Sequence, residues 1–555
     1  MLTRTRVTRL AVGALFAVLT VVAPRAQTLK TPAEESNYTK YTQHDEVARF
    51  LQQVAQVSKE TKVQAIGHTG EAKDFPGANL YLCIITEEGA DGPKALNRRK
   101  PTFMLTASQH GNEQSGKEAA LQLIRDLAVG DMKPLLKQIN FLIIPQANPY
   151  GNFVNRRQNE QNLDLNRDHV KLEAAETRAI HAVFGKWMPE VTLDVHEKGD
   201  DYYRVSTGCV SNVNINPAIE RFERETLLKA VDERVTSGGY TWFEYLVTEP
   251  MGSQSAAGVV ERREPGQARQ PREMITRYST TDLNDGRNSL GIFDTVSFIQ
   301  EGASRHDIPT LKDRTAWQYL GIRGLMEAAA KNSQQVLKLV ADSRAALLKR
   351  AKTPAPDNVV HLKMEYVRDP KQPELVLKRF DRPERPEGAP APQTPPPESE
   401  KVVTETVKNW FPKVESRLAV PRPLGYVVPA AHTDVVHTLL DLGVTVERFT
   451  KDTPLEVEVY EVGEVVPSKD DYVAPERIEV AKRTVQVTAK AGDFYVTGAQ
   501  PAANLVPSML EPQSEYGFIR YRAFKLIPEK GGTFAFLRVV KSVALPLAPY
   551  QKTSE

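Results

Sequence analysis

The chain has 555 residues, a length typical of two or three domains rather than one. Hydrophobic residues make up 41% of it, which is enough to fill a large core. The net charge is only +2 and the basic residues form no stripe, so the composition argues against a nucleic-acid partner or a charged membrane surface.

The N-terminus has the three parts of a signal peptide. Three arginines within the first nine residues precede an apolar run, Leu10–Ala23, and small residues follow up to Ala26. The run is shorter than the roughly 20 residues that a membrane-spanning helix needs. We therefore expect residues 1–26 to be removed after Ala23 or Ala26, leaving a secreted or periplasmic protein without stable membrane insertion. The alternative is an uncleaved N-terminal anchor.

Two cysteines, Cys83 and Cys209, are too few for a disulfide scaffold or a four-cysteine zinc site. Export would permit one disulfide between them, and two buried free thiols are the equal alternative. The sequence gives no indication of the oligomeric state.

Residues 38–352 alternate between strand-like and helical patterns. The expected strands are short and almost fully apolar, as in strands buried on both faces of a mostly parallel sheet. They are Leu80–Thr86, Thr102–Ala107, Asn140–Pro145, Val191–Val195 and Thr295–Ile299, with helices expected at Gly116–Leu127, Leu172–Lys186 and Asp313–Arg350. This alternation predicts an α/β domain with a mixed, mostly parallel sheet flanked by helices.

The composition changes after this domain. Residues 353–420 form an extended segment, and its proline-rich stretch over 382–401 predicts a linker or a long surface loop. Residues 421–555 follow as a smaller β-rich or α+β module. We expect a helix at Thr433–Leu442 and strands at Gly425–Pro429, Val444–Arg448, Leu455–Val462, Arg483–Ala489 and Thr533–Val540.

His110 and Glu113 lie three residues apart, just after an apolar strand. An imidazole nitrogen and a carboxylate oxygen are both good zinc ligands, and a turn of this length lets both point at one ion. The spacing alone is weak evidence, because His68 and Glu71 repeat it. That second pair lies in a glycine-flanked turn of an expected hairpin, and we interpret it as structural.

Two further residues complete a zinc site. A catalytic zinc ion takes about three protein ligands and leaves one position for water. His196 follows the expected strand Val191–Val195 and supplies a third ligand. Glu301 follows another apolar strand, where a buried carboxylate costs roughly several kcal/mol unless it has a partner such as a metal-bound water. Ligands of open α/β sheets gather at the carboxyl ends of the strands, which is where His110, His196 and Glu301 all stand.

A loop rich in asparagine and arginine, residues 155–168, lies between these strands. Such side chains suit the recognition of a carboxylate and the stabilisation of an oxyanion. Asp164 in this loop is placed to orient a zinc-bound histidine. Without the zinc residues, the same loop would be a polar surface with incidental ion pairs.

Five motifs together resemble those of the zinc carboxypeptidase family, peptidase family M14. They are HGNE at 110–113, NPYG at 148–151, DLNRD at 164–168, DVHEKG at 194–199 and SFIQEG at 297–302. Their order and spacing fit over roughly residues 40–345. The resemblance implies the α/β/α fold of that family, one zinc ion and the hydrolysis of C-terminal amide bonds of peptides.

The resemblance also implies roles for the residues of the metal centre. His110, Glu113 and His196 would bind the zinc ion, with Asp164 behind them. Glu301 would act as general base on a zinc-activated water and would pass the proton to the leaving amine.

For substrate binding, the resemblance implies four further residues. Arg157 would polarise the scissile carbonyl and hold the oxyanion. Asn166 and Arg167 would bind the terminal carboxylate of the substrate. Tyr278, 23 residues before Glu301, is the candidate for the active-site tyrosine of the family.

Two other functions stay open. The same zinc chemistry could act on a peptidoglycan peptide, a γ-glutamyl amide or another N-acyl amino acid. A protein of a different class, a pseudoenzyme that binds peptides without cleaving them, is disfavoured because the ligand set and Glu301 are all present.

Overall fold

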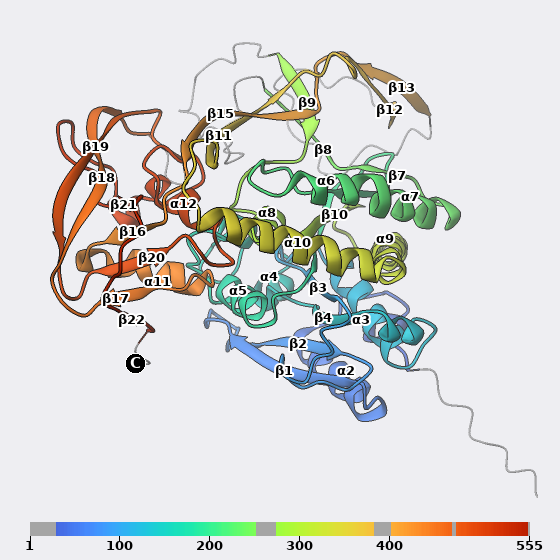
Figure 1. The fold of residues 1–555 in the computed structure, drawn as a ribbon. Helices are drawn as coiled ribbons and strands as arrows, with labels where there is room; N and C mark the ends of the chain where they lie inside the picture. Colours follow the sequence, from blue (N-terminus) through green and yellow to red (C-terminus); the bar gives the residue numbers. More distant parts are fainter. Residues whose placement is uncertain (1–28, 251–272, 382–400, 469–472, 553–555) are drawn as a thin grey trace, which may run out of the picture.

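A computed structural model describes residues 29–250, 273–381, 401–468 and 473–552 of the chain. Its centre is an eight-stranded sheet with the order β1-β2-β4-β3-β5-β10-β6-β7 (Figure 1). Four of its seven neighbouring pairs are parallel, namely β4–β3, β3–β5, β5–β10 and β6–β7. The strands are β1 (Thr61–His68), β2 (Asn79–Ile85), β3 (Thr102–Ala107), β4 (Asn140–Ile144), β5 (Val191–Gly199), β6 (Val205–Gly208), β7 (Trp242–Glu244) and β10 (Val296–Ser304).

Helices cover both faces of this sheet, so the predicted fold class is confirmed. On one face, α3 and α9 pack together and contact β5 and β10, whereas α8 contacts the same two strands from the other face. The helices of this domain are α1 (Pro32–Glu35), α2 (His44–Val57), α3 (Ser115–Ala128), α4 (Pro149–Val154), α5 (Ala175–Trp187), α6 (Pro217–Phe222), α7 (Leu228–Ser237), α8 (Gly286–Gly291), α9 (Leu311–Lys331) and α10 (Ser333–Ala351). Short turns of other helix types are η1 (Lys133–Lys137), η2 (Leu165–Arg167) and η3 (Glu223–Leu227).

The register of β5 and β10 brings polar side chains together. Glu301 lies opposite His196 in this parallel pair, and neighbouring strands are about 4.8 Å apart. Successive side chains of a strand alternate between faces. Val195 therefore points toward α3, whereas Asp194 and His196 point to the α8 side. Glu301, opposite His196, shares that face.

Smaller sheets extend the α/β domain at the top of Figure 1. One has three strands, β8 (Leu246–Pro250), β9 (Met274–Tyr278) and β14 (Trp410–Phe411). Two others have two strands each, namely β11 (Val359–Val367) with β15 (Lys413–Pro421) and β12 (Leu375–Phe380) with β13 (Val402–Val407).

After β15 the chain forms a second unit with a seven-stranded sheet, as predicted for an α+β module. It lies at one flank of the α/β domain, beside α5 (Figure 1). One cluster of buried side chains runs through both units and includes Trp187 of α5 and Leu439 of α11. The strands are β16 (Gly425–Val428), β17 (Glu447–Phe449), β18 (Thr453–Val466), β19 (Arg477–Ala489), β20 (Phe494–Thr497), β21 (Leu537–Val539) and β22 (Leu547–Pro549). The helices are α11 (Thr433–Asp441), α12 (Leu505–Leu510) and the short turns η4 (Ala430–His432), η5 (Phe518–Arg520) and η6 (Arg522–Phe524).

Several predicted elements differ in their bounds. The long helix expected at Asp313–Arg350 is two helices, because the backbone leaves helical geometry at Asn332. The strand expected at Val444–Arg448 begins only at Glu447, and that expected at Thr533–Val540 shrinks to β21. The predicted domain boundaries fall near the ends of α10 and β15, and they stay predictions.

Other expectations concern the cysteines and the N-terminus. Cys83 and Cys209 are buried free thiols, the second of the two alternatives. No helix among the described residues is long and apolar enough to span a bilayer. The predicted signal peptide and nearly all of the proline-rich stretch lie outside the described residues.

Candidate metal centre and active site

The loop after β3 carries His110 and Glu113, and close backbone packing holds it in place. Gly111 of this loop lies against Gly151, so that an added Cβ at Gly111 would sit 2.0 Å from the Gly151 carbonyl carbon. The Gly111 N–H donates to the carbonyl of Arg157 at 3.2 Å. A residue without a side chain is therefore required where the HGNE and NPYG loops meet.

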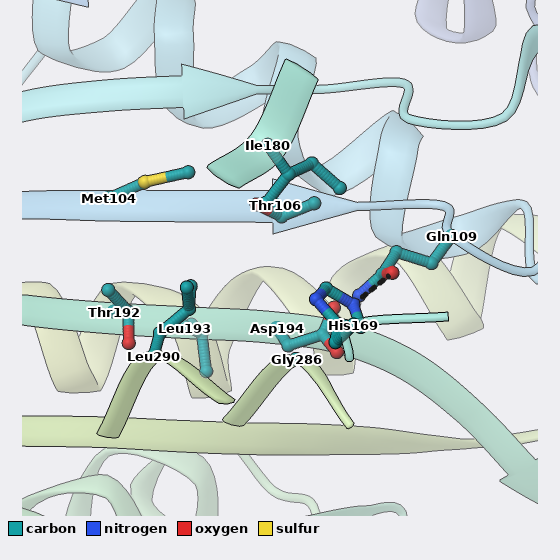
Figure 2. Close-up of a pocket in the computed structure, with 10 residues that line it drawn as sticks. All are labelled: Met104, Thr106, Gln109, His169, Ile180, Thr192, Leu193, Asp194, Gly286 and Leu290. Atoms are coloured by element: carbon teal, nitrogen blue, oxygen red, sulfur yellow. Dashed lines mark hydrogen bonds between the residues drawn. The ribbon is translucent and has the colours of Figure 1, made fainter. Parts of the chain in front are cut away.

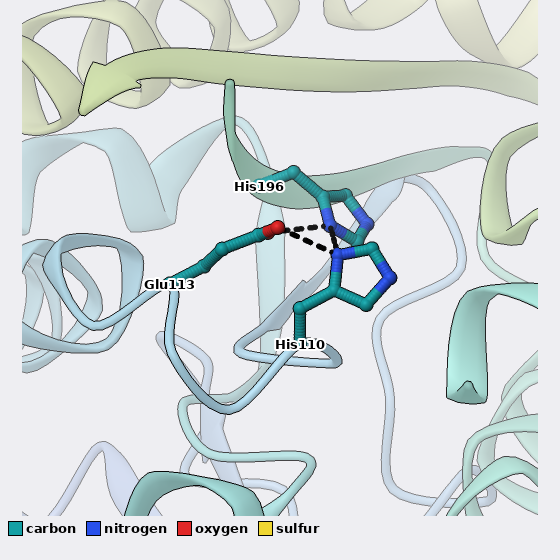
Figure 3. Close-up of side chains that lie close together, drawn as sticks. All are labelled: His110, Glu113 and His196. Carbon is teal, nitrogen blue, oxygen red and sulfur yellow. Dashed lines mark hydrogen bonds and ion pairs between the residues drawn. The ribbon is translucent and has the colours of Figure 1, made fainter. Parts of the chain in front are cut away.

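His110, Glu113 and His196 converge on one buried point (Figure 3). The Glu113 carboxylate lies between the two imidazoles, with Oε1 2.7 Å from His110 Nδ1 and Oε2 2.9 Å from His196 Nδ1. The two Nδ1 atoms are 3.1 Å apart. Among the described residues, this is the one group of three or more potential metal-binding side chains whose ligand atoms are close enough to share an ion.

A second carboxylate lies behind each histidine. His110 Nε2 is 3.0 Å from Asp164 Oδ1, and His196 Nε2 is 2.7 Å from Asp194 Oδ2. A histidine that donates its Nε2–H to a carboxylate keeps an unprotonated Nδ1 available for a metal. Sequence reasoning identified Asp164 but missed Asp194, although its position two residues before His196 puts it on the same face of β5.

The charges of the cluster perturb one another. Burial acts to raise the pKa of Glu113, but the two imidazoles outweigh it and hold that pKa well below its usual range. Burial likewise opposes the charge on His196, yet Asp194 and Glu113 raise its pKa well above the usual value. Two carboxylates thus concentrate negative charge around this imidazole.

This donor set fits a zinc ion. Two imidazole nitrogens and one carboxylate are the mixture that zinc takes in many catalytic sites, where three protein ligands leave a position open. Two Nδ1 atoms that face each other at 3.1 Å cannot both carry a proton. A cation held between His110, Glu113 and His196 would satisfy both nitrogens and the carboxylate together.

Glu301 lies beside the cluster, on the neighbouring strand, and its side chain is buried. Burial raises the pKa of Glu301 to about 7, where a carboxyl group can accept and return a proton near neutral pH. Its Oε2 has no hydrogen-bond partner among the described residues. Burial and the nearby Glu301 carboxylate raise the pKa of Tyr245.

The loop of asparagines and arginines also reaches the cluster. Arg157 Nε donates to Asp164 Oδ2 at 2.8 Å, and its Nη1 is 3.6 Å from Glu113 Oε1. Asn166 Nδ2 lies 3.2 Å from His196 Nε2. Arg167 follows it at the exposed rim of the site. The structure thus brings together all the predicted site residues named so far.

Tyr278 lies apart from this group. Its ring packs against Trp410 with centroids 4.8 Å apart, and the Arg224 guanidinium lies 4.6 Å from the ring centroid. The tyrosine beside Glu301 is Tyr245, between β7 and β8. These contacts do not support Tyr278 as a substrate-binding residue. The sequence carried no signal for Tyr245, because only the pairing of distant strands brings it to Glu301.

The second His-x-x-Glu pair has a different setting. His68 ends β1 in the antiparallel β1–β2 pair, and its Nδ1 lies 2.8 Å from the carbonyl oxygen of Thr69. Both His68 and Glu71 are exposed. This setting agrees with the structural interpretation of the pair.

A small cavity lies behind Asp194 (Figure 2), and polar side chains connect it to the cluster. Gln109 lines the cavity beside Asp194, and its Oε1 is 2.8 Å from His169 Nε2. His169 Nδ1 is in turn 3.0 Å from His181 Nε2. Burial lowers the pKa of both histidines, that of His169 to about 4, so both are neutral at pH 7. These two hydrogen bonds fix Gln109 and His169 beside Asp194.

Comparisons with known proteins give matches to carboxypeptidases. Residues 47–187 match the model of the zinc carboxypeptidase family. "Probable carboxypeptidase 2" of Trichophyton verrucosum is 24% identical over 475 residues, which cover 81% of this chain and 80% of the relative. "Carboxypeptidase M" of Mus musculus is 30% identical over 144 residues, or 23% of this chain and 30% of the relative. Among solved structures, a metallo-carboxypeptidase from Pseudomonas aeruginosa is 18% identical, covers 54% of this chain and 71% of its own, and gives a TM-score of 0.38.

The family-model match and the relatives named carboxypeptidase confirm the resemblance that the five motifs indicated, and the chain is a metallopeptidase of the carboxypeptidase type. The family match includes His110, Glu113 and the loop with Asn166 and Arg167. His196 lies beyond the matched range, and the structure brings it to the other two ligands.

Proposed function

We propose that this protein is an exported carboxypeptidase that removes residues from the C-termini of peptides with one zinc ion held by His110, Glu113 and His196. The observation that carries the proposal is the convergence of three buried ligand atoms beside Glu301. The similarity to relatives named carboxypeptidase 2, which extends over most of both chains, supports the same activity.

In this proposal Glu301 moves the proton. A bound zinc ion supplies Lewis-acid chemistry, which polarises the scissile carbonyl and acidifies the attacking water. Glu301 accepts a proton from that water at a carboxylate oxygen as the new C–O bond forms. It then donates the proton to the amide nitrogen as the C–N bond breaks. Its unpaired Oε2 and its pKa of about 7 support this role.

Other side chains of this site orient the substrate. Arg157, already near Glu113, would hold the carbonyl oxygen as negative charge develops on it. Asn166 and Arg167 would bind the terminal carboxylate through charge-assisted hydrogen bonds. Tyr245 replaces Tyr278 as the proposed tyrosine of the site, because its hydroxyl lies at Glu301.

The test compares the wild type with Glu301→Gln on a blocked dipeptide and on its C-terminal amide. We expect the wild type to release the terminal residue from the free acid only, to lose activity with a chelator and to regain it with zinc. Glu301→Gln should keep the metal and lose roughly 10²–10⁴-fold in rate, because general-base catalysis contributes that much. The matched control, Glu233→Gln on the exposed face of α7, should leave the rate unchanged.

The same assay separates the alternatives. Hydrolysis of internal or cross-linked bonds only would favour a peptidoglycan-peptide amidase, and metal binding without any hydrolysis would favour a peptide-binding pseudoenzyme. Equal rates for the wild type and Glu301→Gln would contradict the proposed base.

Export is the second part of the proposal, and the composition of residues 1–26 supports it. Cleavage after Ala23 or Ala26 leaves Pro24 or Gln27 as the first residue. Intact-mass measurement of protein recovered outside the cytoplasm of a bacterial host should find one of these two masses. A mass that still includes Met1 would contradict the cleavage.

A further inference from the structure

The C-terminal module reaches the loop of residues 279–285, which connects β9 to α8 and is called the β9–α8 loop below. Arg520 in η5 forms a two-pronged ion pair with Asp282 of this loop, with Nη1–Oδ1 and Nη2–Oδ2 distances of 2.8 and 3.3 Å. The side chains are 1% and 5% exposed. The hydroxyl of Tyr516, also fully buried, lies 3.2 Å from Thr281 Oγ1. The module therefore contacts this loop through buried, polar side chains.

The β9–α8 loop in turn holds the proposed carboxylate-binding residues. Asp282 Oδ1 accepts the Asn284 N–H at 3.0 Å, and Asn284 Nδ2 donates to the carbonyl of Arg167 at 2.5 Å. Asn284 Oδ1 accepts the N–H of Val170 at 3.1 Å. These contacts fix the backbone on both sides of His169.

The first residue of α8 contacts Asn166, the other residue proposed to bind the terminal carboxylate. The Gly286 N–H donates to Asn166 Oδ1 at 2.8 Å, which fixes the side-chain amide of Asn166. The Nδ2 of the same amide is the atom 3.2 Å from His196 Nε2. A displacement of the β9–α8 loop would therefore move both Asn166 and the backbone of Arg167.

We infer that Arg520 of the C-terminal module is a positioning residue for the site that binds the terminal carboxylate of the substrate. Its two-pronged bond fixes both the position and the orientation of Asp282, and a buried pair of this kind cannot open without leaving an uncompensated charge in the core. Because Asp282 is hydrogen-bonded to Asn284, and Asn284 to the carbonyl of Arg167, the ion pair also restrains the backbone of Arg167. The inference rests on the proposed function and gives the C-terminal module a part in substrate binding.

The alternative is that Arg520 only docks the module on the α/β domain. Docking alone predicts a loss of stability without a specific effect on substrate affinity. Positioning predicts a rise in KM that is larger than the fall in kcat, and a weaker preference for a free terminal carboxylate.

The experiment uses the full chain with Arg520→Met, which keeps the length of the side chain and removes its charge. The matched control is Arg538→Met. Arg538 is also buried in the module and paired, with Glu511 at 3.0 Å and Glu458 at 2.9 Å, but these partners lie within the module and not in the β9–α8 loop. Each variant is assayed below its own melting temperature on a blocked dipeptide and on its C-terminal amide.

For Arg520→Met we expect a KM for the free acid that rises at least tenfold, with kcat falling less than threefold. Arg520→Lys, which keeps the charge, should recover part of the affinity and covers the case in which Arg520→Met does not fold. The inference would be overturned if Arg520→Met and Arg520→Lys both had the KM of the wild type or the KM of Arg538→Met.

A readout that needs neither metal nor activity separates this inference from the proposed function. Hydrogen exchange of the metal-free protein should be at least tenfold faster over residues 164–170 in Arg520→Met, but not in Arg538→Met. Unchanged exchange there would refute the positioning role. A wild type that shows no preference for the free acid would instead refute the proposed function.

Discussion

At the level of single residues, each histidine of the cluster is held between two carboxylates. Glu113 faces both Nδ1 atoms, while Asp164 and Asp194 face the Nε2 atoms. The outer carboxylates fix the tautomer and the orientation of the rings, so they govern how tightly the inner atoms bind a metal.

Asp194→Asn should therefore weaken zinc binding about 10–100-fold, the usual effect of losing such an outer partner. Competition with a coloured chelator measures the dissociation constant. Asp45→Asn, the same change at an exposed helix position, serves as the control. An unchanged zinc affinity in Asp194→Asn would show that Asp194 does not orient His196.

The pKa of Glu301 sets the expected response to pH. The base must be deprotonated to accept a proton, so activity is lost as the pH falls through its pKa. Burial raises this pKa to about 7, and a bound cation would lower it from there. We expect kcat/KM to fall tenfold per pH unit on an acidic limb whose midpoint lies at or below about pH 7. A profile that is flat down to pH 4 would contradict the assignment.

A second buried carboxyl group, Glu176, makes the stability of the protein, unlike its activity, decrease as the pH rises. Burial and the nearby Glu160 raise the pKa of Glu176 to about 7. The folded state then binds the proton more tightly than the unfolded state does, so stability is lost as the pH rises from about 4.5 to 7. Glu176→Gln should raise the free energy of unfolding by about 1–3 kcal/mol at pH 8 and change it little at pH 4.5. Thermal melts at both pH values measure this, and a loss of stability at pH 8 would contradict it.

At the level of elements, the site depends on close backbone packing between two loops, which meet at Gly111 and Gly151. Gly111→Ala would place a methyl group against the Gly151 backbone and push the His110 loop away. We expect a loss of at least roughly 1–3 kcal/mol in unfolding free energy together with reduced zinc content. Gly199→Ala in β5 is the matched control, because an added Cβ there meets nothing within 4 Å. Equal zinc content in the two variants would argue against this packing constraint.

The elements of the α/β domain could be predicted because their signals are local. The strand β3 has the predicted bounds, and His110 lies in the loop after it as predicted. The strands β5 and β10 continue beyond their predicted ends, so His196 and Glu301 lie within these strands and not after them. Asp194 was within reach of the same reasoning, through the two-residue period of β5. Tyr245 and Asp282 were not, since their partners Glu301 and Arg520 come from segments whose pairing the sequence does not reveal.

At the level of the whole molecule, one buried core joins the α/β domain and the C-terminal module. The proline-rich stretch, predicted as a linker or a long surface loop, left open whether two independent units are tethered there. In the structure the module is packed against α5 and bonded to the β9–α8 loop. Two units that share a core unfold together. Calorimetry should therefore give a single transition, and two separate transitions would show that the module folds independently.

The zinc content of the purified protein tests the central claim most directly. Elemental analysis of the wild type, Glu113→Gln and His196→Ala should find about one zinc ion per wild-type chain and little in either variant, because each variant removes one of three ligands. Glu71→Gln, at the second His-x-x-Glu pair, should keep the wild-type zinc content. Zinc that survives in Glu113→Gln and His196→Ala, or is lost in Glu71→Gln, would contradict the site proposed at His110, Glu113 and His196.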